Sequence, residues 1–93
     1  MIDRIVALSF GTIVGFPAER VLHEHGRGET RDLACLVFAL FDGPDVIVVD
    51  TGPPDPAVTA DFHRYRLSQT PQQRPRSALE SIGVDPSRVT AVV

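Results

Sequence analysis

The segment Asp42–Gly52, with the sequence DGPDVIVVDTG, constrains the fold of this chain more than any other stretch. At its centre, Val46–Val49 is a continuous run of β-branched residues without polar alternation. Such a run is typical of a strand that is covered on both faces. The run stops at Asp50, because Gly52 permits a positive φ and the two prolines after it lack a backbone donor. We therefore expect a buried strand that ends sharply at Asp50.

Asp50 is the residue of this segment that most needs a chemical explanation. A carboxylate at the end of a buried strand costs free energy unless it is hydrogen-bonded or close to a cation. In one interpretation the carboxylate caps the amides of the turn that follows, which is a common role of aspartate. In the other interpretation Asp50 lies near a catalytic site.

Two other segments have strand patterns. In Arg4–Val14, apolar residues on one face alternate with small residues on the other, and the small face suits the close approach of another backbone. Leu33–Phe41 is a second apolar run, which the short sequence DGPD connects to the strand ending at Asp50. Two apolar runs joined in this way predict an antiparallel hairpin. Gly15–Thr30, between the two segments, is expected to be a loop.

The first helix of the second half is predicted from its start. Asp55 can cap a helix whose first residue is Pro56, and we expect the helix to cover Ala57–Arg66. Its apolar residues Val58, Phe62 and Tyr65 would share one face.

The remaining segments alternate between polar loops and short apolar elements. Leu67–Pro75 is polar and predicts a loop, and Arg76–Ile82 predicts a second helix with Ala78, Leu79 and Ile82 inward. Gly83 suits the left-handed residue that ends a helix. Asp85 begins a further turn, and Val89–Val93 is an apolar strand in which the sequence stops.

Composition limits the class of protein. The 93 residues allow one small domain, and 43% hydrophobic residues fit a globular chain. A net charge of −3 without a basic run excludes a nucleic-acid footprint. No apolar run is long enough for a signal core or a membrane span, so we expect no membrane association and a soluble, cytoplasmic protein.

Cys35 and the histidines are weak candidates for chemistry. The only cysteine, Cys35, lies in an apolar stretch and is expected to be a buried structural thiol rather than a nucleophile, which fits a reducing compartment. His23 and His25, at a spacing of two, would point to one side of an extended segment and are weak metal candidates. Two ligands do not close a metal site and His63 is far away in sequence, so a solvated loop is the alternative interpretation.

The end of the sequence allows two interpretations. Natural termini are usually exposed, whereas Ala91, Val92 and Val93 are apolar and form strands readily. They belong either to an ordinary C-terminal edge strand or to a chain that continues further.

The order of these motifs resembles the N-terminal part of the metallo-β-lactamase-fold hydrolases, in particular the N-acyl homoserine lactonase-like branch. The similarity covers nearly the whole chain, and the ordered series is more specific than Asp-Thr-Gly alone. The matching pieces are LSFGT at Leu8–Thr12, the predicted hairpin, Asp50-Thr51-Gly52, a helix, Thr70-Pro71, SALESIGVDP at Ser77–Pro86, and Val89–Val93.

The resemblance implies an α+β fold, with residues 1–93 as a single partial domain. This domain would be the N-terminal half of an αββα sandwich, in which a mostly antiparallel sheet has its helices on one face. The sheet would then have an open edge and an apolar face awaiting its partner, which predicts self-association or poor solubility.

The resemblance also implies a chemistry, the metal-dependent opening of lactones or related esters in quorum quenching. Zinc or another divalent metal activates a water there, and its ligands lie in a Thr-His-x-His-x-Asp-His loop directly after the strand matching Val89–Val93. This chain stops before that loop, so we expect no catalytic residue in it and no activity of the chain alone. Only Asp50, with Thr51 and Gly52, carries over, as a structural carboxylate beside the metal edge of the sheet. The loop matching Gly15–Arg31 would border the substrate pocket or a subunit contact.

Two other hypotheses remain. The chain could be a self-contained α+β interaction module without catalysis, which burial of Val92 and Val93 by the chain's own residues would favour. It could also be a metal-binding module that uses His23 and His25.

Overall fold

The computed structural model describes all 93 residues and contains one mixed five-stranded sheet. The strand order is β4-β1-β2-β3-β5, and only the β3–β5 pair is parallel. The strands are β1 (Arg4–Pro17), β2 (Thr30–Asp42), β3 (Asp45–Val49), β4 (Arg66–Ser68) and β5 (Val89–Val92). The helices are α1 (Pro56–Val58), which continues as a π-helical turn (Thr59–His63), and α2 (Pro75–Ser81), with 3₁₀ turns at Ala18–Arg20, Pro71–Gln73 and Pro86–Arg88. The α+β class expected from the sequence is confirmed.

The antiparallel hairpin predicted from the two apolar runs is confirmed. β2 and β3 are antiparallel, with Phe38 opposite Val49 and Asp42 opposite Asp45 across the turn. β1 extends three residues beyond the predicted Val14, since its last part pairs with the start of β2 as far as Pro17 opposite Thr30. The predicted loop from Gly15 is correspondingly shorter.

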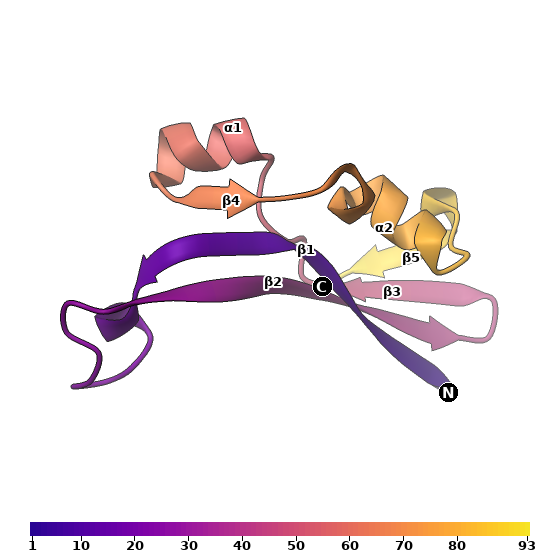
Figure 1. The fold of residues 1–93 in the computed structure, drawn as a ribbon. Coiled ribbons are helices and arrows are strands. Elements are labelled where there is room, and N and C mark those ends of the chain that lie inside the picture. Colours follow the sequence, from indigo (N-terminus) through magenta and orange to yellow (C-terminus); the bar gives the residue numbers. More distant parts are fainter.

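The helices lie on one side of the sheet, as Figure 1 shows for α1 and α2. The core forms between this side of the sheet and α2. It consists of Leu8, Phe10, Val37, Ala39, Val46, Val48, Ala78, Leu79 and Val84. The prediction that Ala78 and Leu79 point inward is confirmed, and Gly83 has the expected left-handed conformation with φ +80°.

The first helix differs from its prediction. The Asp55 carboxylate caps the amide of Val58 at 2.9 Å, as expected, but the helical segment ends at His63 and is mostly a π turn. Thr59 is its only buried residue, whereas Phe62 is 81% exposed. The predicted length to Arg66 is therefore wrong, and Tyr65 lies outside the helix whose face it was expected to share with Val58 and Phe62.

Strand β4 lies where the sequence predicted the end of the first helix, at Arg66, and the start of a polar loop. Its residues pair with the free edge of β1, Leu67 opposite Ile13, at a bulge around Gly11. Gly11 has φ +130°, and a Cβ there would lie 2.8 Å from Leu67 Cδ1 and 2.9 Å from the Ser68 oxygen. Glycine thus permits the close approach of β4, because the small face of β1 leaves room for a second backbone.

The second face of the sheet has no layer over it. In β3, Val46 and Val48 are buried, but Ile47 and Val49 on the opposite face are only half-buried. The expectation that this run is covered on both faces is therefore wrong within residues 1–93. We call the uncovered apolar surface the outer face; its residues, which share one side according to the strand register, are Ile5, Ala7, Leu36, Phe38, Leu40, Ile47 and Val49.

Candidate functional site at the carboxyl ends of β3 and β5

The site is the edge of the sheet where β3 and β5 both end. The two strands are parallel, so their carboxyl ends lie at the same edge. The ladder continues one step past the strands, because the Val93 amide donates to the Val48 oxygen at 2.9 Å and the Asp50 amide donates to the Val93 oxygen at 2.8 Å. Asp50 and Val93 are therefore hydrogen-bonded neighbours.

Asp50 itself turns the chain away from the sheet. Its φ of +75° lies in a region that aspartate tolerates better than most residues. Its Oδ1 accepts hydrogen bonds from the amides of Thr51, at 2.6 Å, and Gly52, at 3.3 Å. The carboxylate of Asp50 therefore caps the amides of the turn, as in the first of the two interpretations. Because Asp50 is exposed, its charge does not pay the free-energy cost of burial that was considered from the sequence.

Gly52 fits tightly against the core behind the site. Its φ is +71°, and a Cβ there would lie 2.5 Å from Cδ2 of Phe10. No side chain fits at this position without displacing Phe10. Asp50 and Gly52 therefore fix the path of the turn, and Thr51 between them is exposed.

A shallow hollow of about 510 Å³ lies beside this turn. Asp50, Gly52 and Pro53 line one side of it, and Ile13, Ala34, Cys35 and Leu36 line the other. Burial raises the pKa of the Cys35 thiol; a backbone hydrogen bond at Ile13 opposes this effect in part, and the charge of Asp50 adds a smaller increase. The thiol is consequently protonated at neutral pH, which agrees with a structural cysteine, although Cys35 is half-buried rather than buried.

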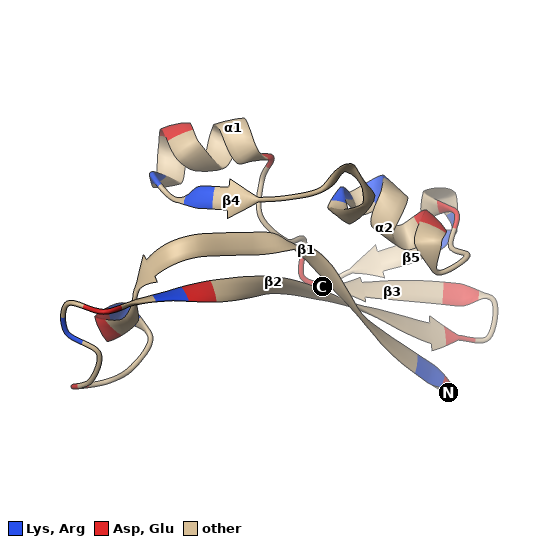
Figure 2. Ribbon diagram, in the orientation of Figure 1, with Lys and Arg blue, Asp and Glu red and all other residues tan.

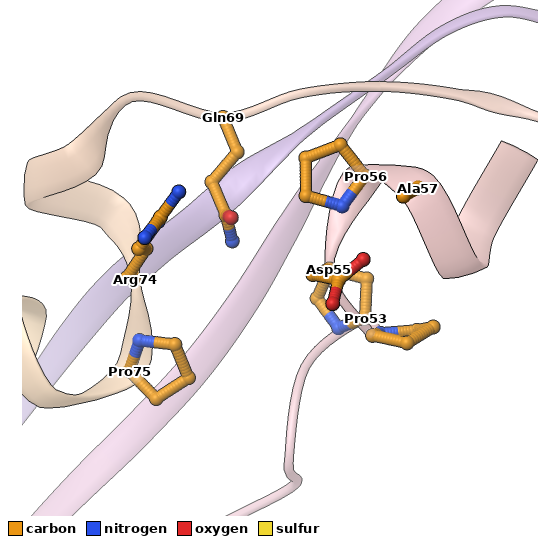
Figure 3. A pocket seen from close by; sticks show the side chains of 8 residues that line it. Pro53, Asp55, Pro56, Ala57, Gln69, Arg74 and Pro75 are labelled. Atoms are coloured by element: carbon orange, nitrogen blue, oxygen red, sulfur yellow. The ribbon is translucent and has the colours of Figure 1, made fainter.

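The largest pocket follows the same turn along the chain and has a volume of about 710 Å³ (Figure 3). Pro53–Ala57 line one wall, and Gln69, Arg74 and Pro75 line the other. The Gln69 side chain donates a hydrogen bond to the Phe10 carbonyl oxygen at 2.8 Å, and the Asp55 carboxylate caps the helix. Arg74 is therefore the one charged side chain of this pocket without a hydrogen bond. Sequence reasoning missed Gln69 and Arg74, because isolated polar residues in a loop give no pattern.

The two histidines His23 and His25 are not part of a cluster of metal ligands. The side chains of His23 and His25 are exposed, and Glu24 between them has φ +59°, so the segment is not extended as assumed. No group of three or more His, Cys, Asp or Glu side chains in the chain is arranged to hold a metal ion. The side chains of residues 1–93 therefore do not fit a zinc or other divalent metal site, which needs at least three protein ligands. The loop Gly15–Arg31 also does not line the largest pocket.

Comparison with known proteins gives a likeness of fold. No protein-family model and no curated protein matches the sequence. Among solved structures, an N-acyl homoserine lactone hydrolase with the product N-hexanoyl-L-homoserine bound at its catalytic metal centre is 19% identical, with a TM-score of 0.77 over 99% of this chain and 40% of that one. A quorum-quenching N-acyl homoserine lactone lactonase is 20% identical, with a TM-score of 0.78 over 99% of this chain and 36% of that one.

A third match is a B. thuringiensis AiiA variant with N-decanoyl-L-homoserine bound at its active site. It is 18% identical, with a TM-score of 0.78 over 99% of this chain and 40% of that one. The chain thus has the fold of part of these lactonases and spans between 36% and 40% of the three structures described here. The expectation of a partial metallo-β-lactamase-like fold is confirmed. Separately, none of the helices is long and apolar enough to cross a membrane.

Proposed function

We propose that residues 1–93 supply the sheet layer bearing Asp50 in a lactonase-like hydrolase that opens a lactone or a related ester with the help of zinc or another divalent metal. The observation that carries the proposal is the match of 99% of this chain to the lactonase structures at TM-scores of 0.77 and 0.78. The order of sequence motifs, found independently, supports the same relationship.

The metal ligands of such a hydrolase would come from outside residues 1–93. Metal-assisted ester opening needs a site that activates water and polarises the carbonyl. The chain has no cluster of donors for such a site, so we propose that the 93 residues alone are inactive. Their part would be to form and position one wall of the site.

Asp50 would perform that positioning. Its Oδ1 is engaged by the amides of Thr51 and Gly52, while Oδ2 accepts no hydrogen bond from the chain. The Asp50 amide donates a hydrogen bond to the Val93 carbonyl oxygen, so a segment that continued from Val93 would begin close to the Asp50 carboxylate. A free carboxylate oxygen can orient a histidine or an amide of that segment.

The first test is to sequence the gene beyond the Val93 codon. A continuation, in frame or after a frameshift, that reads Thr-His-x-His-x-Asp-His is the expected result. The longer product, loaded with zinc, should open N-acyl homoserine lactones, and the 93-residue chain should not. A stop codon followed by unrelated sequence, or lactone opening by the 93 residues alone, would overturn the proposal.

The hypothesis of a self-contained interaction module receives less support. Its criterion was burial of the last residues by the chain itself, yet Val92 is 57% exposed and Val93 is 78% exposed. Only 13 of the 93 residues are buried, so the core is small for an independent module. A cytoplasmic location stays a prediction from the sequence.

A further inference from the structure

The largest pocket contains two opposite charges that are not paired with each other. Arg74 lies on one wall and Asp55 on the other, and they are the only charged residues that line it (Figure 3). The Arg74 side chain makes no hydrogen bond and no ion pair with the rest of the chain. Asp55 caps the Val58 amide with Oδ1, and its Oδ2 accepts no hydrogen bond. The pocket therefore has a free cation on one wall and a free acceptor on the other.

Both walls are held in place by the chain itself. On one wall, the prolines within Pro53–Pro56 fix the backbone, because the proline ring restricts φ. The other wall is tied to β1 by two glutamine side chains. Gln69 donates to the Phe10 oxygen at 2.8 Å, and Gln73 donates to Ser9 Oγ at 3.1 Å. A ligand would thus find a pocket that needs little ordering, which lowers the free-energy cost of binding.

The pocket groups match one class of ligand. A guanidinium pairs well with a carboxylate, to which it can donate two parallel hydrogen bonds. Oδ2 of the ionised Asp55 can only accept, so it suits an N–H group and repels a second anion. The proline rings offer carbon surface to a hydrocarbon chain, and about 710 Å³ is a volume typical of pockets for small organic molecules. An N-acyl amino acid has a carboxylate, an N–H group and a hydrocarbon chain together.

The pocket lies on the helical side of the sheet. Its walls are the segment that leads into α1 and the segment that connects β4 to α2 (Figure 1). This side is opposite the outer face, so a further layer packed on the outer face leaves the pocket open. A ligand site here is therefore compatible with a chain that continues beyond Val93.

We propose that this pocket binds an N-acyl amino acid, with the ligand's carboxylate on Arg74, its amide N–H on Asp55 and its acyl chain against the proline rings. The opened form of an N-acyl homoserine lactone belongs to this class, whereas the closed lactone has no carboxylate for Arg74. The pocket consequently retains the opened form in preference to the lactone. This last step rests on the proposed function, while the class of ligand follows from the pocket alone.

The test is a titration of the 93-residue chain followed by the NMR shifts of the Ala57 and Gln69 amides, in mildly acidic buffer in which the lactone stays closed. N-hexanoyl-L-homoserine should bind with a dissociation constant below about 1 mM. N-hexanoyl-L-homoserine lactone, without the carboxylate, and hexanoate, without the N–H group, should each bind at least about tenfold more weakly.

Two arginine variants form a matched pair. Arg74→Gln removes the charge that contacts the ligand and should raise the dissociation constant of N-hexanoyl-L-homoserine at least about tenfold. Arg76→Gln removes the same charge two residues away, at an exposed arginine that pairs with Glu80 and does not line the pocket, and should leave binding unchanged. Both positions are exposed, so neither variant removes a core contact.

A third variant tests the opposite wall. Asp55→Asn keeps a side chain that caps helices well but removes the charge. It should weaken N-hexanoyl-L-homoserine at least about threefold and leave the weak binding of hexanoate unchanged.

Four results would overturn the proposal: no binding of N-hexanoyl-L-homoserine up to about 10 mM, equal binding of the closed lactone, equal binding of hexanoate, or equal effects of Arg74→Gln and Arg76→Gln. The proposed function fails on a separate result, the opening of the lactone by the 93 residues alone. That result would leave the ligand class of the pocket standing, so the two failures are distinguishable.

Discussion

The amide nitrogen of Asp50 lies 2.8 Å from the carbonyl oxygen of Val93, so the turn after β3 and the last residue of the chain are held together at one edge of the sheet. The sequence separates these residues by two helices and a short strand. Their contact gives Asp50 two structural tasks, since its backbone extends the β3–β5 ladder and its carboxylate fixes the turn.

Asp50→Ala should therefore be more costly than Asp50→Asn. Asparagine keeps an oxygen that can accept from the turn amides and tolerates the φ of +75°, whereas alanine does neither. We expect Asp50→Ala to lower the free energy of unfolding by about 1–2 kcal/mol more than Asp50→Asn. Urea unfolding of both variants measures the difference. Equal unfolding midpoints would show that the Asp50 side chain does not stabilise the turn.

Gly52→Ala should destabilise the chain more than Gly83→Ala. Both glycines have positive φ, but a Cβ at Gly52 meets Phe10 at 2.5 Å while a Cβ at Gly83 meets nothing within 4 Å. The backbone strain is common to both variants, and overpacking against Phe10 adds about 1–3 kcal/mol at Gly52. The difference in unfolding free energy between the two variants isolates this contact, and a difference near zero would show that the turn can shift freely.

Gly11→Ala should release β4 from the sheet. A Cβ at Gly11 would meet Leu67 and the backbone of Ser68, while Gly15→Ala, the control at another positive φ in β1, meets nothing within 4 Å. Hydrogen exchange of the β4 amides should become at least about tenfold faster in Gly11→Ala than in Gly15→Ala. Unchanged protection of β4 in Gly11→Ala would mean that the bulge adapts to a side chain.

We expect ionisation of Cys35 to destabilise the folded chain in alkaline solution. Burial raises the pKa of this thiol in the folded chain above its usual value of 9.0, so the folded state holds the proton more tightly than the unfolded state. Its contribution to stability is then full below pH 9 and is lost as the pH rises through the folded pKa. The unfolding free energy should fall less steeply above about pH 9 in Cys35→Ala than in the wild type. If the unfolding free energies of the two proteins changed in parallel with pH, the raised pKa of Cys35 would be contradicted.

Part of the candidate site could be read from the sequence. The strand end at Asp50, its role in capping the turn and the need for glycine at position 52 all follow from local backbone chemistry. The contact with Val93 could not be derived from local patterns, because the parallel pairing of β3 with β5 depends on how the intervening segment crosses the sheet. Gln69 and Arg74 of the largest pocket were missed because isolated polar residues in a loop give no pattern.

The sequence by itself determined the local elements: the β2–β3 hairpin, helix α2 with Gly83 at its end, and the turns begun by Asp55 and Asp85. These follow from periodicity, capping and the conformational limits of glycine and proline, which act within a few residues. Tertiary structure decided that Arg66–Ser68 becomes a strand, because the free edge of β1 supplies hydrogen-bond partners that cannot be predicted from the sequence of the segment itself. Tertiary structure also decided which face of the valine run is buried. An apolar pattern indicates only that burial is favourable, and the single helical layer buries only the face with Val46 and Val48.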